Sequence, residues 1–121
     1  MGKKKFSVLV ADDEFWVREN LRTLIDWDKY GFLFLEPAID GNDALDKMSK
    51  MKPDIVITDV NMPFLTGIDL IKKMRDKFPD TAVFVLSGYN DFNYVRESLL
   101  AGAIDYLLKP VDKSDLLKVL L

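Results

Sequence analysis

Five short apolar runs alternate with five stretches of helical periodicity along the chain, and no internal repeat or low-complexity segment interrupts them. Strands are predicted at residues 6–11, at 32–35 with an extension toward 38, and at 54–58, 82–86 and 104–107. The runs IVIT and AVFVL are almost continuously apolar, which is typical of parallel strands covered on both faces. The alternation therefore predicts an α/β fold in which helices cover both faces of a five-stranded parallel sheet.

Helices are predicted at residues 14–25, 42–51, 67–77, 91–101 and from 113 onward. Thr66 and Asp112 are the predicted N-caps of the third and fifth helices, and Gly102 is the predicted end of the fourth. The last segment, LLKVLL, still has helical periodicity where the sequence stops. We therefore expect that residues 1–121 were cut from a longer protein; the alternative is a native terminus after a short last helix.

Length and composition narrow the classes of function. A chain of 121 residues fits one domain, and it contains no His and no Cys. Ser-His-Asp and Cys-His catalysis, disulfides and zinc fingers are therefore excluded, and a metal could bind only through oxygen.

Charge and hydropathy patterning argue against nucleic acid and membrane as direct partners. Seventeen basic and twenty acidic residues give a formal net charge of −3, which is the wrong sign for a surface that binds nucleic acid. The basic start, Lys3 to Lys5, precedes an apolar run that stops at Asp12, too short for a signal peptide or a membrane span. We expect a cytoplasmic protein.

Polar side chains follow four of the predicted strands. Asp12 and Asp13 follow the first, Asp59 the third, Ser87 the fourth and Lys109 the fifth. In a parallel sheet these positions meet at the carboxyl edge, where ligands bind. Clustered carboxylates repel one another unless a cation is present, and Mg²⁺, with Mn²⁺ as a possible substitute, suits an oxygen site that also takes phosphate.

Each of these residues also has an ordinary interpretation. The Asp12-Asp13 pair, and Asp13 in particular, can be the N-cap of the first helix, and Asp59 can bond its own loop backbone. Ser87 with Gly88 can form a turn, and Lys109 can be a solvated surface lysine. Their joint occurrence at strand ends favours a site.

The motifs at these positions resemble those of a known family over the whole chain. They are Asp12-Asp13-Glu14, Asp59-Val60-Asn61-Met62-Pro63 with Gly67, Leu86-Ser87-Gly88, and the run from Asp105 to Pro110, DYLLKP. This set resembles the receiver domain of two-component response regulators, whose fold is a flavodoxin-like (βα)5 three-layer sandwich. The segments LIDWDKYGF at 24–32 and SGYNDFNYVRESLLAGAIDYLLKPV at 87–111 further resemble receivers joined to AraC-type helix-turn-helix domains.

The resemblance implies a role for each matching residue. Asp59 would be the phosphoacceptor for a sensor histidine kinase. Asp13 and Asp59 would give carboxylate oxygens to Mg²⁺, Asn61 its backbone carbonyl, and Asp12 would hold a metal-bound water. Lys109 would pair with phosphoryl oxygens.

The resemblance also implies a switch. Ser87 would move to the phosphoryl group and Tyr106 would fill the space it leaves, which changes the surface of the fourth helix, fifth strand and fifth helix. The peptide bond between Lys109 and Pro110 is predicted to be cis. The partners implied are the kinase, a C-terminal DNA-binding domain that controls transcription, and a second copy of the chain when it is phosphorylated. Such a domain catalyses only its own phosphorylation and dephosphorylation.

Three alternatives remain open at this stage. A haloacid-dehalogenase-type phosphatase also uses an aspartate nucleophile with Mg²⁺, but it needs an acid where this chain has Asn61. A pseudo-receiver would keep the fold as an interaction module without phosphotransfer, although such proteins usually lose part of the acid set or the lysine. A stand-alone receiver is the third alternative.

Overall fold

The computed structural model describes residues 5–63, 65–88 and 92–121. Strands and helices alternate along it, as predicted: β1 Phe6–Ala11, α1 Phe15–Leu24, β2 Phe32–Phe34, α2 Gly41–Met51, β3 Ile55–Asp59, α3 Gly67–Lys77, β4 Ala82–Ser87, α4 Phe92–Ala101, β5 Asp105–Leu108 and α5 Lys113–Leu120. The predicted start of the fourth helix at Asp91 lies outside the described residues. No helix within the described part of the chain has the length and apolar character to cross a membrane.

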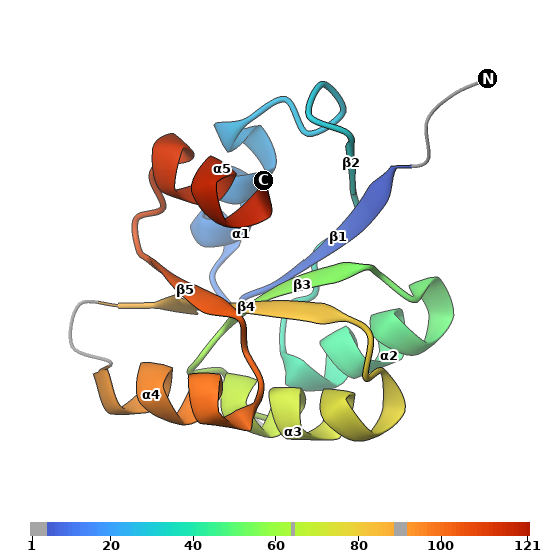
Figure 1. Ribbon diagram of the computed structural model, residues 1–121, viewed down its shortest axis with the longest axis vertical. Helices are drawn as coiled ribbons and strands as arrows, with labels where there is room; N and C mark the ends of the chain where they lie inside the picture. The colour runs from blue at the N-terminus through green and yellow to red at the C-terminus, as the bar shows by residue number, and fades with distance from the viewer. Residues whose placement is uncertain (1–4, 64, 89–91) are drawn as a thin grey trace.

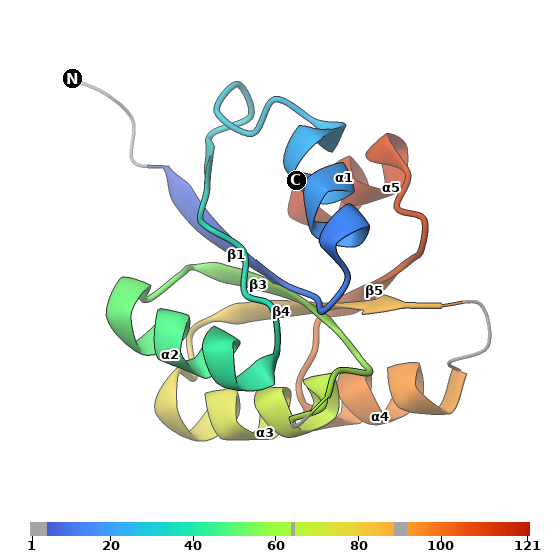
Figure 2. The same cartoon turned by 180° about the vertical axis from the view of Figure 1, so that it is seen from behind.

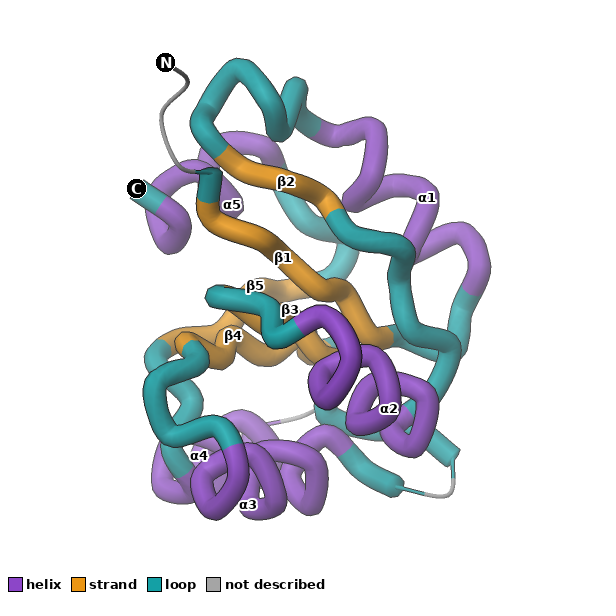
Figure 3. The backbone as a smooth tube through the Cα atoms, turned by 90° about the vertical axis from the view of Figure 1, so that its right-hand side faces the viewer, coloured by secondary structure: helices purple, strands orange, loops and turns teal. Residues whose placement is uncertain are grey.

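All five strands are parallel and form one sheet in the order β2-β1-β3-β4-β5. Helices α1 and α5 cover one face, and α2, α3 and α4 cover the other (Figures 1 and 2). Figure 3 shows β2 beside β1 at one edge of the sheet. The fold class, a flavodoxin-like three-layer sandwich, is confirmed. In this strand order the chain reverses its direction of winding between β1 and β3, the place where such sheets bind ligands.

The sheet separates two apolar clusters, because successive side chains of a strand point to opposite faces. Val8 and Val10 of β1 pack toward α1 and α5 with Leu21 and Leu116, whereas Leu9 packs toward the helices of the other face. Strands β1, β3 and β4 are buried along most of their length, which explains their continuous apolar sequence.

The predicted helix ends are largely confirmed. The Thr66 hydroxyl accepts a hydrogen bond from the Asp69 amide at 3.2 Å, and the Asp112 carboxylate accepts one from the Ser114 amide. Gly102 follows α4 with φ of +126°, a conformation that suits glycine.

The interpretation of Asp13 as the N-cap of the first helix is wrong. Glu14 occupies that position, its side chain makes no capping hydrogen bond, and its amide donates to Asp12 Oδ1 at 2.8 Å. The Asp12 side chain thus organises the loop before the helix begins. Because the Glu14 backbone is extended, α1 starts one residue later than predicted.

Two predicted strand ends shift by one residue in a way that matters for the site. Asp59 is the last residue of β3 and Ser87 the last of β4, rather than residues that follow these strands. Both side chains therefore sit on the regular ladder, where Asp59 pairs in register with Leu86.

Candidate functional site

Three of the predicted residues meet at the carboxyl edge of the sheet. Asp12 comes directly after β1, Asp59 ends β3, and Lys109 comes directly after β5. Lys109 Nζ lies 2.8 Å from Asp12 Oδ2 and 3.2 Å from Asp59 Oδ2. Both carboxylates are buried, and only 18% of the Lys109 side chain is exposed. One ammonium group therefore bridges two carboxylates that would otherwise repel each other.

Asp12 is held from several directions. Its amide donates to the Ala38 carbonyl at 3.1 Å, and its own carbonyl accepts from Arg18 Nη1 at 2.8 Å. Its carboxylate accepts from the Glu14 amide and pairs with Lys109. Sequence reasoning missed Arg18, because nothing in the linear pattern distinguishes it from the other charged residues on this helix.

Asp13 and Glu14 complete an acidic loop with Asp12. Each of the three offers a carboxylate oxygen, and these oxygens lie within 4.8 Å of one another. Asp12 is buried, whereas Asp13 and Glu14 are exposed. Such a set of hard oxygen donors suits Mg²⁺ or Mn²⁺. Glu14 belongs to the acidic motif, but its place in this cluster was not predicted.

Asn61 and Ser87 lie at the same edge. The Asn61 amide donates to Asp59 Oδ1 at 3.3 Å, which orients that carboxylate. The Ser87 carbonyl accepts from the Lys109 amide at 2.9 Å. Ser87 Oγ is buried and has no hydrogen-bond partner among the residues that the structure describes. A buried hydroxyl of this kind is costly unless a polar group can approach it.

Gly67 allows α3 to begin against the Asp59 backbone. A Cβ atom at this position would lie 2.1 Å from the Asp59 carbonyl oxygen and 2.8 Å from Val60 Cα. The Gly67 amide also donates to the Val60 carbonyl at 3.1 Å. The absence of a side chain at residue 67 therefore fixes the path of the chain after β3.

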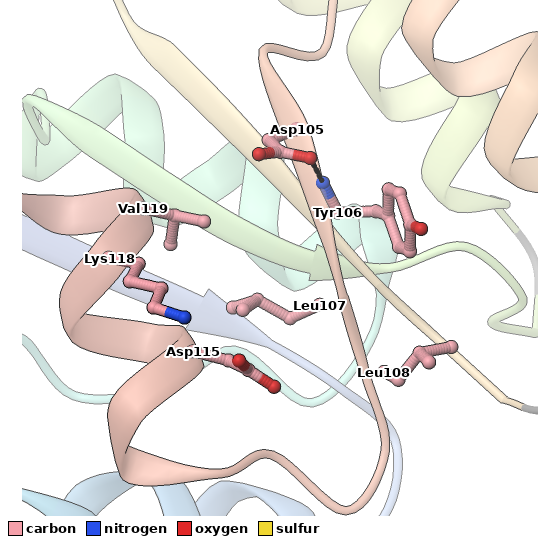
Figure 4. Close-up of a pocket in the computed structure, with 7 residues that line it drawn as sticks. All are labelled: Asp105, Tyr106, Leu107, Leu108, Asp115, Lys118 and Val119. Carbon is pink, nitrogen blue, oxygen red and sulfur yellow. Dashed lines mark hydrogen bonds between the residues drawn. The ribbon is translucent and has the colours of Figure 1, made fainter.

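Tyr106 lies on β5 in register with Val85, and 43% of it is exposed. Figure 4 shows its ring on the opposite side of the strand from Leu107, which faces α5. A shallow groove of about 310 Å³ runs between β5 and α5, lined by Asp105, Tyr106, Leu107, Leu108, Asp115, Lys118 and Val119. The peptide bond between Lys109 and Pro110 is cis, as predicted.

Burial is the largest cause of the shift in the pKa of Asp59. It raises the pKa of this carboxyl from 3.8 to about 6, although Lys109 and the Asn61 amide favour the ionised form; the nearby charge of Asp12 raises it further. For Lys109, burial disfavours the charged form, but the hydrogen bond and charge of Asp12 and the charge of Asp59 outweigh it and raise the pKa. At neutral pH the site thus holds an ammonium group beside a carboxylate that is close to its titration range.

The comparisons with known proteins agree with this arrangement. Residues 8–121 match the family of response regulator receiver domains. The chain is 40% identical over 111 residues to the transcriptional regulatory protein HptR of Staphylococcus aureus, covering 92% of this chain and 43% of HptR. It is 38% identical over 115 residues to a response regulatory protein of Staphylococcus epidermidis, covering 95% of this chain and 45% of that protein. The chain thus spans less than half the length of these relatives.

Solved structures give the same result. The receiver domain of AraT, a response regulator from Geobacillus stearothermophilus, superposes with a TM-score of 0.89 at 37% identity, over 94% of this chain and 88% of that one. A two-component transcriptional regulator AraC from Clostridium phytofermentans superposes with a TM-score of 0.86 at 34% identity, over 96% of this chain and 90% of that one. Fold, motif positions and relatives agree, and the chain belongs to the response regulator receiver domain family.

Proposed function

We propose that this chain is a phosphorylation-dependent switch that accepts a phosphoryl group on Asp59 from a sensor histidine kinase. The observation that carries the proposal is the meeting of Asp59, Asp12 and Lys109 at one edge of the sheet, with Lys109 Nζ 2.8 and 3.2 Å from the two carboxylates. Membership of the receiver family supports it.

The residues present fit a divalent cation and a phosphoryl group. The acidic loop supplies clustered oxygens. The buried Ser87 Oγ, which has no hydrogen-bond partner in the described part of the chain, supplies a donor for a phosphoryl oxygen. Asp13 and Asp59 would hold Mg²⁺ through carboxylate oxygens, Asn61 through its backbone carbonyl and Asp12 through a water; Mn²⁺ suits the same donors. When bound, the cation offsets the negative charge of the transferring phosphoryl group.

Asp59 acts as the nucleophile. A pKa of about 6 leaves its carboxylate mostly ionised at pH 7, and burial limits its solvation. One carboxylate oxygen forms a bond to phosphorus while the bond from phosphorus to the phosphohistidine nitrogen breaks, and the imidazole leaves with that electron pair. Lys109 pairs with the developing phosphoryl charge. Because the phosphoryl group ends on Asp59 of the same chain, the protein modifies only itself and does not turn over a separate substrate.

The switch uses Ser87 and Tyr106. Ser87 Oγ donates to a phosphoryl oxygen, and the half-exposed Tyr106 ring moves into the space that Ser87 leaves. The phosphoryl group shifts the balance between the two forms by the difference in its contacts to each. The altered surface spans α4, β5 and α5, which includes the groove of Figure 4, and a second phosphorylated copy docks there.

The output is control of transcription in the cytoplasm, through a DNA-binding domain that follows this chain in the full-length protein. The names of the relatives, a transcriptional regulatory protein and an AraC regulator, support this inference. The greater length of HptR, of which this chain covers 43%, supports it too. A net charge of −3 is consistent with DNA contact by another domain.

Intact-mass measurement after incubation with acetyl phosphate tests the phosphotransfer. We expect a single phosphoryl adduct that requires Mg²⁺, is labile on standing and is absent from Asp59→Asn. The exposed Asp115, on α5, provides the matched control, and Asp115→Asn should be labelled like the wild type. If no adduct forms at early quenched times although Mg²⁺ binds, the chain is a pseudo-receiver that acts as an interaction module.

A further inference from the structure

Arg18 connects α1 to the acidic loop formed by Asp12, Asp13 and Glu14. It lies in the first turn of the helix, and its Nη1 donates to the Asp12 carbonyl oxygen at 2.8 Å. Its guanidinium carbon is 5.9 Å from the centre of the Phe15 ring, within the range of a cation–π contact. One half-buried side chain therefore reaches back over the loop that precedes its own helix.

The acidic loop needs such support. Its three carboxylate oxygens lie within 4.8 Å of one another and repel, and α1 has no side-chain N-cap to fix the loop. The Asp12 amide is bonded to Ala38 and the Glu14 amide to Asp12 itself. Arg18 adds the hydrogen bond that fixes the Asp12 carbonyl, and with it the peptide plane that leads into Asp13.

The charge of Arg18 also influences a second element. Burial disfavours the ionised form of Asp43 on α2, but the Ile39 amide, Lys47 and the charge of Arg18 outweigh it and lower the pKa of this carboxyl. The charge of Arg18 therefore acts on the start of α2 as well as on the acidic loop. A permanently charged, planar group with several donors can hold the Asp12 carbonyl while its charge acts on Asp43.

We propose that Arg18 is a positioning residue that holds the acidic loop in the geometry that binds a divalent cation. It acts through the Asp12 backbone and does not touch the cation. The proposal rests on the proposed function, because it assumes that the loop takes part in a magnesium site.

Positioning and simple charge predict opposite results for Arg18→Met. Removing a positive charge near carboxylates strengthens the binding of a cation. Releasing the Asp12 carbonyl lets the loop depart from its binding geometry and weakens the binding. The sign of the change therefore separates the two roles.

The experiment is a Mg²⁺ titration at constant ionic strength, followed by the rise in Tm and by isothermal calorimetry. The variants are Arg18→Met, Arg18→Lys and Arg18→Gln, with far-ultraviolet circular dichroism as the check of folding. Arg22→Met is the matched control, because Arg22 lies one turn further along α1 and pairs with Glu19 on the exposed surface.

We expect Arg18→Met to bind Mg²⁺ about tenfold more weakly than the wild type, as is typical when an outer support of a metal site is lost. Arg18→Lys and Arg18→Gln should retain most of the affinity, because each keeps a donor for the Asp12 carbonyl, and Arg22→Met should bind like the wild type. If Arg18→Met does not fold, the Lys and Gln variants decide: similar affinities support positioning, whereas clearly tighter binding by Arg18→Gln alone overturns it.

Equal or tighter Mg²⁺ binding by a folded Arg18→Met also overturns the proposal. Its failure is distinguishable from failure of the proposed function. Wild-type protein that binds Mg²⁺ but forms no adduct with acetyl phosphate refutes phosphotransfer and leaves the Arg18 result intact. Wild-type protein that does not bind Mg²⁺ refutes both the metal site and the role of Arg18.

Discussion

Asp59 is a residue at which burial and neighbouring charge oppose each other. Its carboxylate is almost fully removed from solvent, yet it lies 3.2 Å from the Lys109 ammonium. Burial prevails, so the pKa is about 6 rather than 3.8. Burial therefore destabilises the ionised form of this carboxyl in the folded protein. Such destabilised groups are common in functional sites.

This pKa predicts how stability depends on pH when no divalent cation is present. Between pH 3.8 and about 6 the folded protein holds a proton on Asp59 that the unfolded chain releases. The free energy of unfolding therefore falls as pH rises through this window, and Asp59→Asn should be more stable than the wild type at pH 7.5, by on the order of 2 kcal/mol. Urea unfolding in EDTA at pH 4 and pH 7.5 measures this difference. A difference between the two proteins that is the same at both pH values would contradict the assignment.

Gly67 is a residue whose role is local and steric. Gly67→Ala would place a Cβ atom 2.1 Å from the Asp59 carbonyl oxygen, so the backbone must move. We expect a loss of about 1–3 kcal/mol in the free energy of unfolding. Because Asp59 moves with its backbone, labelling by acetyl phosphate should also slow. Urea unfolding and intact mass measure the two effects, and a variant with wild-type stability would show that the contact is unimportant.

At the scale of an element, α2 shows a strained end. It begins with the Asp40 carboxylate accepting from the Asp43 amide at 2.7 Å, and it ends at Lys52 in the left-handed region, with φ of 47° and ψ of 62°. The Lys52 amide still donates to the Met48 carbonyl. A residue with a Cβ atom adopts this conformation at a cost that glycine does not have.

Lys52→Gly should therefore stabilise the protein by about 0.5–1 kcal/mol. Lys50→Gly is the matched control, since Lys50 is an exposed lysine inside the same helix, and glycine there should destabilise by about 1 kcal/mol. Chemical unfolding of both variants measures the two changes. Equal destabilisation by both would mean that the conformation of Lys52 is not strained in solution.

At the scale of the whole molecule, the acidic edge joins the ends of β1, β3 and β5. A ligand that binds there binds only the folded chain, because the unfolded chain does not bring these residues together. Such binding stabilises the fold by mass action.

We predict that Mg²⁺ raises the Tm at constant ionic strength, with a stabilisation of about 2.7 kcal/mol at a hundredfold excess over Kd. Asp13→Ala should abolish this shift. Asp76→Ala removes the same charge from an exposed position on α3 and should leave the shift unchanged. Differential scanning calorimetry with and without Mg²⁺ measures it, and coincident melting curves for the wild type would refute the metal site.

The element order was predictable because its signals are local. Apolar runs and helical periodicity identified the five strands and five helices of the described residues, and most errors are a residue or so at their ends. The exception is the extension of the second strand toward residue 38, because β2 ends at Phe34 and Ala38 forms only an isolated bridge with Ala11. The interpretation of Asp13 as a helix cap failed because the Glu14 backbone is extended, so α1 begins at Phe15 and Glu14 takes the cap position. The path of the loop before the helix decides this, and residue type alone does not.

Much of the site was also predictable, since parallel strands bring their carboxyl ends to one edge whatever their sequence. This rule was sufficient to select Asp12, Asp59 and Lys109 as neighbours. Their assigned roles, and those of Asp13, Asn61, Ser87 and Tyr106, remain predictions that labelling and metal titration test.

The sequence by itself determined the fold class, the order of the elements and which side chains stand at the ends of the strands, because periodicity and the geometry of parallel sheets depend on residue type and spacing. The tertiary structure decided that Lys109 lies nearer to Asp12 than to Asp59, that Arg18 holds the Asp12 carbonyl, and that burial raises the pKa of Asp59. These features depend on distances of a few ångströms between segments far apart in the chain, and on the removal of water around them. Neither these distances nor the removal of water can be inferred from residues that are adjacent in the sequence.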